Sequence, residues 1–200
     1  MKVFLDKKSI YYSEKSKVLE NCITVTDGTT SYYYEFVPNG NKALVITNNL
    51  SYITDAVLEY RKYKKYINIF YTKDRSYYEE FEYTFSFKLP ISCIQPSKFF
   101  IDSDALDLYE KYKEYDETYV KVAIINEEYV CIDGHTKLYA MLMDYEKLVN
   151  VFIDDYPYYI NDFVYIAKEQ NLRNIKSINV VNHEEYEKYW LSFINEYEEK

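Results

Sequence analysis

Five consecutive residues, Asp133-Gly-His-Thr-Lys137, have the side chains and the setting of an anion-binding turn. They follow a short apolar run at 129–132 and precede a segment whose apolar residues have helical spacing. The first backbone N–H groups of a helix lack partners within the helix and lie at the positive end of its dipole. His135 and Thr136 would add hydrogen-bond donors, and Lys137 would add a mobile positive charge. The turn therefore predicts a site for phosphate or a similar anion.

Asp133 is an unusual neighbour for a phosphate. It would suit the site if it capped the helix, bound a magnesium ion or took a proton from a hydroxyl group. The same residues also fit a purely structural turn, because Asp-Gly commonly precedes a helix and His135 could simply bond to the backbone. The residues alone leave both interpretations open.

Periodicity predicts the elements that would position this turn. Between residues 88 and 154, β-prone runs at 91–94, 119–125, 129–132 and 148–153 alternate with two helices. The first helix would be capped by Asp102 or Ser103, with a buried stripe at Ala105, Leu108, Tyr109 and Tyr112. After Pro157 the pattern is helical, with a short helix at 163–167 and a longer one capped near Asn182.

The first 87 residues predict a different set of elements. β-prone runs lie at 1–5, 21–26, 31–37, 42–47 and 66–71, and an alternating pattern at 80–89 predicts one long strand. Ile53, Ala56, Val57 and Tyr60 have the spacing of one buried helix stripe, with Asn49 or Ser51 as the cap. The chain is thus predicted to be α+β (mixed α/β), with a small α/β region at 1–87, an α/β domain at 88–154 and a helical extension at 155–200 packed on that domain.

Charge and composition narrow the classes of function. The chain carries a net charge of −9. Residues 1–87 hold 12 basic and 11 acidic residues, whereas 88–200 hold 12 and 22, so the second half is strongly acidic and nucleic-acid binding is not expected of it. The one basic cluster, Arg61-Lys-Tyr-Lys-Lys65, could contact RNA or single-stranded DNA, but it fits better the exposed face at the end of a helix.

Cysteine and histidine content predicts neither a disulfide framework nor a zinc site. There are three Cys without C-x-x-C spacing and two His, and His183-Glu-Glu185 lies where a helix cap is expected. No apolar run approaches the length of a membrane span, and the start of the chain lacks a signal-peptide pattern. The expectation is a soluble cytoplasmic protein without a membrane partner.

Four segments of the second half follow one another in a recognisable order. They are the Ile91-Ser-Cys-Ile-Gln-Pro-Ser97 opening, the Val130-Cys-Ile-Asp-Gly-His-Thr-Lys137 turn, the apolar helix after it and the Val149-Asn-Val-Phe-Ile153 strand. Residues 87–154, about a third of the chain, thereby resemble the ParB-like and sulfiredoxin-like superfamily. The turn is similar to the Asp-Gly-His-x-Arg variant of some members, including free-serine kinases.

This resemblance implies a nucleotide-binding α/β domain in which Gly134, His135, Thr136 and Lys137 hold phosphates, with Mg²⁺ accompanying the nucleotide. It also implies an acidic base after the first strand, for which Asp102 and Asp104 are candidates. Their residue types fit equally the N-cap and first-turn acids of the next helix.

The sequence departs from the family pattern at three places. His135 occupies the position of the sulfiredoxin nucleophilic Cys, Lys137 replaces the family Arg, and the second Arg of the partition proteins is absent. Sulfinic-acid reduction and a CTP clamp on DNA are therefore not expected.

Three functions follow as alternatives. The first is binding of a nucleotide or phosphorylated small molecule at 133–137, with phosphoryl transfer or nucleotide hydrolysis if the chain is an enzyme, and with Asp102, Asp104 and Asp133 as the candidate catalytic residues. The second is a non-catalytic interaction protein that retains the fold. The third is a nucleic-acid-binding, partition-like protein. The substrate and the oligomeric state remain open.

Overall fold

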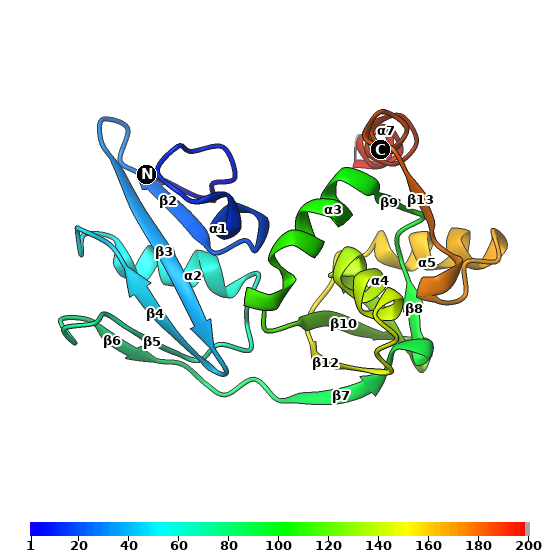
Figure 1. Cartoon of the computed structure of the whole chain (residues 1–200), viewed down its shortest axis with the longest axis horizontal. Helices are drawn as coiled ribbons and strands as arrows, with labels where there is room; N and C mark the ends of the chain where they lie inside the picture. The colour runs from blue at the N-terminus through cyan, green and yellow to red at the C-terminus, as the bar shows by residue number, and fades with distance from the viewer. Residues whose placement is uncertain (199–200) are drawn as a thin grey trace. The chain divides into compact units, whose positions relative to one another are not determined.

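The structure is a computed structural model that describes residues 1–198. It contains helices and mixed β-sheets, which confirms the predicted α+β class. The chain forms two compact units (Figure 1). The first comprises residues 1–85 together with Glu114–Glu117, and the second comprises the rest. The sequence-based division at residue 87 assigns Glu114–Glu117 to the second domain, whereas the structure includes this segment in the first unit.

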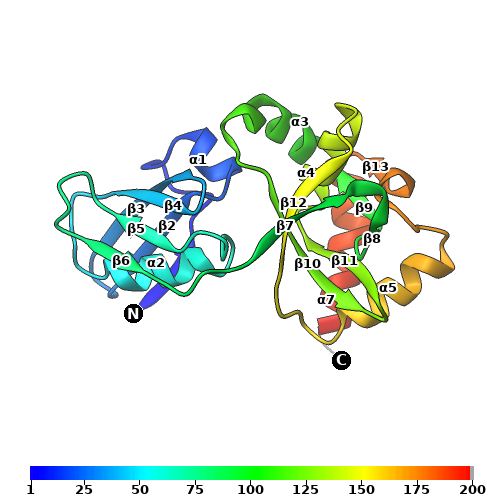
Figure 2. The ribbon, with the colours of Figure 1, turned by 90° about the horizontal axis from the view of Figure 1, so that it is seen from below.

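The first unit is a six-stranded sheet in the order β1-β2-β3-β4-β5-β6. Its elements are β1 (Lys2–Leu5), α1 (Glu14–Val18), β2 (Cys22–Thr26), β3 (Ser31–Asn39), β4 (Lys42–Ile46), α2 (Ile53–Arg61), β5 (Ile69–Tyr71) and β6 (Tyr78–Glu80). Neighbouring strands are antiparallel except β4 and β5, which are parallel and are connected through α2. Figures 1 and 2 show α2 lying across one face of the sheet.

The predicted stripe of α2 is confirmed, because Ile53, Ala56, Val57 and Tyr60 are all buried. The Tyr60 ring stacks on Phe36, with ring centroids 3.9 Å apart. The predicted cap is wrong. The N-cap is Tyr52 in the left-handed region, while the Asn49 side chain accepts the Ser51 N–H in a turn ahead of the helix.

The long strand predicted at 80–89 is also wrong. The chain leaves the first sheet after β6 and begins the second unit with β7 (Ser86–Pro90), so the same alternating pattern spans two strands in two different sheets. Phe81 packs edge-on against Phe70, whereas Phe87 packs against the core of the second unit. An alternating pattern indicates which residues of an extended segment are apolar. It does not indicate where one strand ends and the next strand, paired with a different neighbour, begins. β5 is likewise shorter than the run predicted at 66–71.

The basic cluster at 61–65 is less exposed than its composition indicates. Lys64 is buried, and its Nζ lies 3.5 Å from Asp116 Oδ1, with 4% and 1% of the two side chains exposed. The Arg61 guanidinium lies over the Phe81 ring, 4.1 Å from its centroid. Asp116 comes from the inserted segment Glu114–Glu117, in which Glu117 also accepts the Gly40 N–H at 2.6 Å. Arg61 and Lys64 therefore pack within the first unit, whereas Lys62 is exposed and pairs with Glu59.

We expect Asp116→Ala to lower the free energy of unfolding of the first unit by about 3–5 kcal/mol, because it removes a charged partner from the buried Lys64 ammonium. Combining Asp116→Leu with Lys64→Met should recover much of this loss. Urea unfolding followed by circular dichroism measures both effects. The exposed pair Lys7–Glu20 provides the control, since Lys7→Ala should cost less than about 1 kcal/mol. Equal losses for Asp116→Ala and Lys7→Ala would contradict the assignment.

The second unit is built on a five-stranded sheet in the order β7-β12-β10-β11-β8, with a separate pair β13-β9. After β7 its elements are η1 (Ile91–Cys93), β8 (Ile94–Pro96), β9 (Phe100–Asp102), α3 (Ser103–Tyr112), β10 (Tyr119–Ile125), β11 (Glu128–Asp133), α4 (His135–Met143), β12 (Leu148–Ile153), α5 (Ile160–Glu169), η3 (Ile175–Ser177), β13 (Asn179–Val181), α6 (His183–Tyr186), η4 (Glu187–Leu191) and α7 (Ser192–Glu198). The short helix η2 (Lys113–Tyr115) follows α3 and leads into the segment Glu114–Glu117 of the first unit. The predicted β10–β11 hairpin is confirmed.

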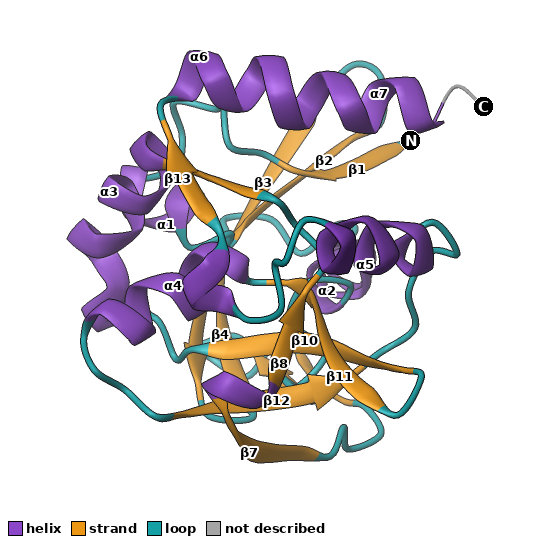
Figure 3. Ribbon diagram, turned by 90° about the vertical axis from the view of Figure 1, so that its right-hand side faces the viewer, coloured by secondary structure: helices purple, strands orange, loops and turns teal. Residues whose placement is uncertain are grey.

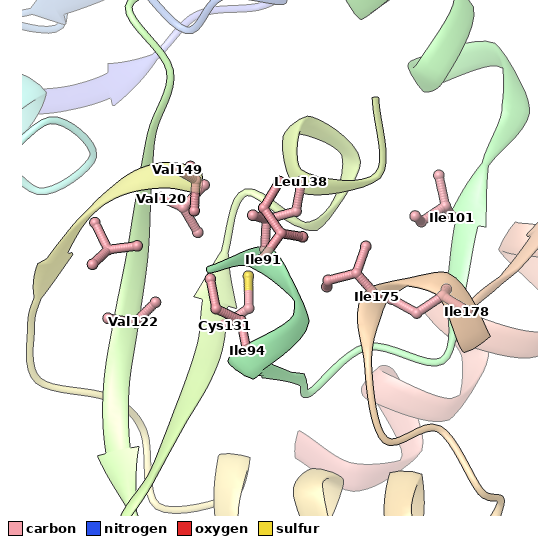
Figure 4. Close-up of a cluster of buried hydrophobic side chains, with 11 residues drawn as sticks. Ile91, Ile94, Ile101, Val120, Val122, Cys131, Leu138, Val149, Ile175 and Ile178 are labelled. Carbon is pink, nitrogen blue, oxygen red and sulfur yellow. The ribbon is translucent and has the colours of Figure 1, made fainter. Parts of the chain in front are cut away.

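Two apolar clusters fill the second unit. Val120 and Val122 of β10 belong to the cluster beneath α4, whose side chains meet in Figure 4. Ala123 and Ile125 belong to the other cluster, which contains α5 and the C-terminal helices. Because side chains alternate along a strand, the two clusters lie on opposite faces of the sheet, as Figure 3 shows for α4 and α5.

Three local predictions for this unit need correction. The run 91–94 begins as the 3₁₀ helix η1 and not as a strand. In α3 the side chains directed at the core are Leu106 and Tyr109, whereas Leu108 is 40% exposed, so the predicted stripe is rotated. The extension after 155 is not purely helical, because β13 pairs in parallel with β9. Neither of these short strands has an alternating pattern long enough to predict it.

Within residues 1–198, no helix combines the length and the apolar character needed to cross a membrane.

Candidate functional site

The predicted turn lies where two neighbouring parallel strands end. β11 and β8 are paired in parallel, with Cys131 opposite Pro96, so both strands end at the same edge of the sheet. Ser97 follows β8, and Asp133 is the last residue of β11. In open α/β sheets, ligands bind at the carboxyl ends of strands. The second unit therefore presents the turn at the edge where a binding site is expected.

Gly134 is required by the shape of this turn. It is the N-cap of α4 and has φ of +96°, in the left-handed region that favours glycine. A Cβ at this position would lie 3.3 Å from Cγ2 of Val120, a buried side chain of β10. Glycine therefore serves both the backbone conformation and the close packing of the turn on the sheet.

The start of α4 leaves backbone N–H groups outside the helical ladder. The first hydrogen bond of α4 runs from Leu138 N–H to Gly134 O, so the N–H groups of His135 and Thr136 precede the helical ladder. Asp133 Oδ1 accepts the Gly134 N–H at 2.8 Å, and the Asp133 side chain is exposed. Asp133 is therefore not the helix N-cap, one of the three roles open to it from the sequence, although it fixes the turn just before the helix.

His135 has a different role from the predicted one. Its side chain is buried, and its Nε2 accepts the Ser97 N–H at 3.2 Å, while Ser97 Oγ donates to Cys131 O at 2.7 Å. Burial, with a smaller contribution from the Lys98 charge, lowers the pKa of His135 to about 3. The ring is therefore neutral, and its Nε2 is used within the fold as the acceptor for the Ser97 N–H.

Lys137 and Thr136 lie in the first turn of α4 and are partly exposed. The Lys137 Nζ lies 5.9 Å from the centroid of the Tyr109 ring of α3. Lys98, which no sequence motif marks, lies close enough to His135 for its charge to add to the effect of burial in lowering the pKa of the ring. Burial raises the pKa of the nearby Cys131 thiol, and the Lys98 charge opposes that rise. Its Nζ also lies 5.0 Å from the centroid of the Tyr186 ring. Two cationic side chains, those of Lys137 and Lys98, thus lie near the turn.

Asp102 confirms its predicted role as a helix cap, since its Oδ1 accepts the Asp104 N–H at 2.9 Å. Its other oxygen, Oδ2, lies 2.6 Å from Nδ1 of His183. The cap predicted near Asn182 is confirmed, because the Asn182 Oδ1 accepts the Glu185 N–H at 2.9 Å and His183 follows as the first residue of α6. No sequence signal links two residues 81 positions apart, because their pairing depends on the parallel strands β9 and β13.

The structure thus separates the predicted residues into two groups. His135 is joined to Ser97, and Asp102 is joined to His183. Among residues 1–198, the polar contacts of Asp102 go to Asp104 and His183 and not to the turn. In the same part of the chain, no group of three or more His, Cys, Asp or Glu side chains is arranged to hold a metal ion.

Comparison with known proteins gives little further information. No protein-family model matches the sequence, and no curated protein matches it. Among solved structures, protein Atu1540 from Agrobacterium tumefaciens is similar at a TM-score of 0.36 and 14% sequence identity. The match covers 48% of this chain and 62% of the Agrobacterium chain. At this level of similarity we infer neither a shared fold nor a shared function.

Replacing Gly134 tests the shape of the turn. We expect Gly134→Ala to lower the free energy of unfolding by about 1–2 kcal/mol because of the left-handed backbone. The contact of the added Cβ with Val120 should lower it further. Gly28→Ala is the matched control, because Gly28 has φ of +104° and no heavy atom within 4 Å of the added Cβ. Urea unfolding of the two variants should show the larger loss for Gly134→Ala. A smaller loss there than for Gly28→Ala would exclude tight packing at the turn.

Acid should destabilise the protein through His135. The pKa of the folded state, about 3, lies below the usual 6.5, so the unfolded chain takes up the proton first. The contribution of His135 to stability is complete above pH 6.5 and falls by up to about 1.4 kcal/mol per pH unit as the pH drops towards 3. His135→Gln keeps an acceptor for Ser97 without titrating. Unfolding free energies at pH 6.5 and 4.5 should therefore fall more steeply for the unsubstituted protein; parallel changes would refute the assignment.

Proposed function

We propose that the second unit binds a nucleotide or another phosphorylated small molecule at the Asp133–Lys137 turn. The observation that carries the proposal is the left-handed Gly134 at the start of α4, at the common edge of β8 and β11. This geometry directs backbone N–H groups of the first helical turn outward at the positive end of the dipole. The resemblance of residues 87–154 to ParB-like and sulfiredoxin-like proteins supports a phosphate as the ligand.

The side chains around the turn agree with this proposal. Lys137 and Lys98 supply positive charge, while Thr136 supplies a hydroxyl donor. The exposed Asp133 carboxylate is suited to a magnesium ion that arrives with a nucleotide, since Mg²⁺ is commonly held by one or two carboxylates together with substrate phosphates. His135 contributes its backbone N–H to the turn, and its ring fixes the turn against β8.

Phosphoryl transfer is the reaction we propose for this site, with Asp102 or Asp104 as the acidic residue that acts as the base, as the resemblance implies. A non-catalytic interaction protein is the second candidate. It is favoured by the burial of His135, which gives the turn a structural purpose whether or not a ligand binds.

Nucleotide binding can be measured through the single tryptophan, Trp190, which is buried in the second unit and reports its unfolding. We expect ATP, ADP or CTP with Mg²⁺ to raise the melting temperature. At a ligand concentration ten times Kd the stabilisation is about 1.4 kcal/mol, which corresponds to roughly 3–6 °C. Inorganic phosphate is run in parallel to distinguish a nucleotide site from a simple anion site.

Lys137→Ala should abolish the shift, because it removes the cation beside the turn. Lys147→Ala is the matched control, since Lys147 is exposed and lies just after α4. The proposal fails if none of the nucleotides or phosphate changes the melting temperature, or if Lys137→Ala retains the full shift. A shift without turnover of ATP would favour the non-catalytic candidate.

A further inference from the structure

One imidazole ring lies between acidic groups of two different elements in the second unit. His183 is the first residue of α6, and its Nδ1 lies 2.6 Å from Oδ2 of Asp102 at the end of β9. Its Nε2 lies 3.5 Å from Oε1 of Glu187, one helical turn further along. Asp102 is largely buried, whereas about half of the His183 side chain is exposed. The ring is thus reachable by protons from solvent while its main partner is fixed inside the fold.

The chemistry of this arrangement depends on the charge of the ring. A protonated imidazole carries an N–H on both nitrogens, so it can donate to Asp102 and attract Glu187 at once. A neutral imidazole has only one N–H. If that proton stays on Nδ1 towards Asp102, the lone pair of Nε2 faces the Glu187 carboxylate and the second attraction becomes a repulsion.

We propose that protonation of His183 fastens the C-terminal helical segment, residues 183–198, to β9 and the start of α3, and that deprotonation loosens this attachment. The proposal is independent of any ligand at the Asp133–Lys137 turn. It assigns to His183, the residue after the Asn182 cap, a pH-sensitive structural role.

The charges around the ring favour the protonated form at neutral pH. The hydrogen bond and charge of Asp102 raise the pKa of His183 above 6.5, and Glu187 and Asp104 add to the effect. Lys98 also contacts this segment, because its Nζ lies over the rings of Tyr186 and Trp190. A positive charge at the first residue of a helix is unfavourable with the helix dipole, so the acidic partners are what hold it there.

The segment that His183 fastens contains a large aromatic contact. Trp190 and Phe193 pack against Phe99 and Phe163, with the rings of Trp190 and Phe99 centred 5.1 Å apart. Phe99 immediately precedes β9, the strand that ends at Asp102. Loosening the attachment at His183 therefore acts on the aromatic residues next to it, and Trp190, the one tryptophan of the chain, should become more accessible to small quenchers.

The direction of the pH effect follows from the raised pKa. The attachment contributes fully below pH 6.5, where His is protonated in both folded and unfolded states, and is lost as the pH rises through the folded pKa of His183. We expect acrylamide quenching of Trp190 to increase between pH 5.5 and 8.5 with a midpoint above 6.5. The proton resonances of the His183 ring should titrate with the same midpoint, while those of His135, whose pKa is about 3, stay constant.

Substitutions separate this role from a merely structural one. His183→Gln, which cannot become charged, should lose the pH-dependent step. Asp102→Asn keeps an oxygen to cap α3 but removes the charge, so it should also lose the step. Glu187→Gln should lower the midpoint, whereas Glu184→Gln, the same charge change in the same helical turn, should leave it close to that of the unsubstituted protein.

Two results would overturn the proposal. One is quenching of Trp190 that does not change between pH 5.5 and 8.5 in the unsubstituted protein. The other is a pH-dependent step that persists unchanged in His183→Gln. Because quenching is measured on folded protein, circular dichroism at both pH values confirms that each variant retains its secondary structure before it is compared.

Discussion

The hydrogen bond from the Ser97 backbone to the His135 ring is the interaction on which the candidate site depends. It joins the ends of two parallel strands, β8 and β11, at the point where the chain turns into α4. The ring is buried and its pKa is lowered, so it is held as a neutral acceptor. An unpaired backbone N–H or ring nitrogen at this depth would cost about as much as a lost hydrogen bond, so the two groups require each other.

This contact explains why the turn has its particular shape. With His135 directed inward at Ser97, the residue before it must reverse the chain over Val120, and only glycine does so without strain or a steric clash. The N–H groups of His135 and Thr136 then precede the helical ladder of α4. A histidine whose ring serves the fold is therefore compatible with the anion-binding role that we propose for the backbone of the turn.

Local patterns in the sequence predicted the helices and strands better than the long-range contacts between them. The α2 stripe, the β10–β11 hairpin and the cap at Asp102 are confirmed because each depends on residues within a few positions of one another. The pairs Ser97 with His135 and Asp102 with His183 bridge 38 and 81 positions, and they arise from parallel strand pairing that no short pattern encodes. The chemistry of the site depends on these long-range pairs.

Buried charge was the second feature that the sequence could not predict. Lys64 belongs to a run of basic residues with an ordinary surface composition, yet it is buried against Asp116. Its partner comes from a segment inserted after α3, more than fifty positions further along the chain. Charged residues are rarely buried unless they are paired. The composition of the basic run therefore predicts an exposed Lys64 as long as its partner is unknown.

Asp102 shows how the structure limits the chemistry available to the second unit. One of its oxygens accepts the Asp104 N–H and the other contacts His183, so both are occupied by groups that hold elements together. A carboxylate that accepts a proton from a substrate hydroxyl needs an oxygen directed at that hydroxyl. Each carboxylate oxygen has two lone pairs, so Asp102 would act as a base only through a lone pair that these two contacts leave free. The charge of His183 therefore affects both the attachment of the C-terminal segment that we propose and the oxygen of Asp102 that the ring contacts.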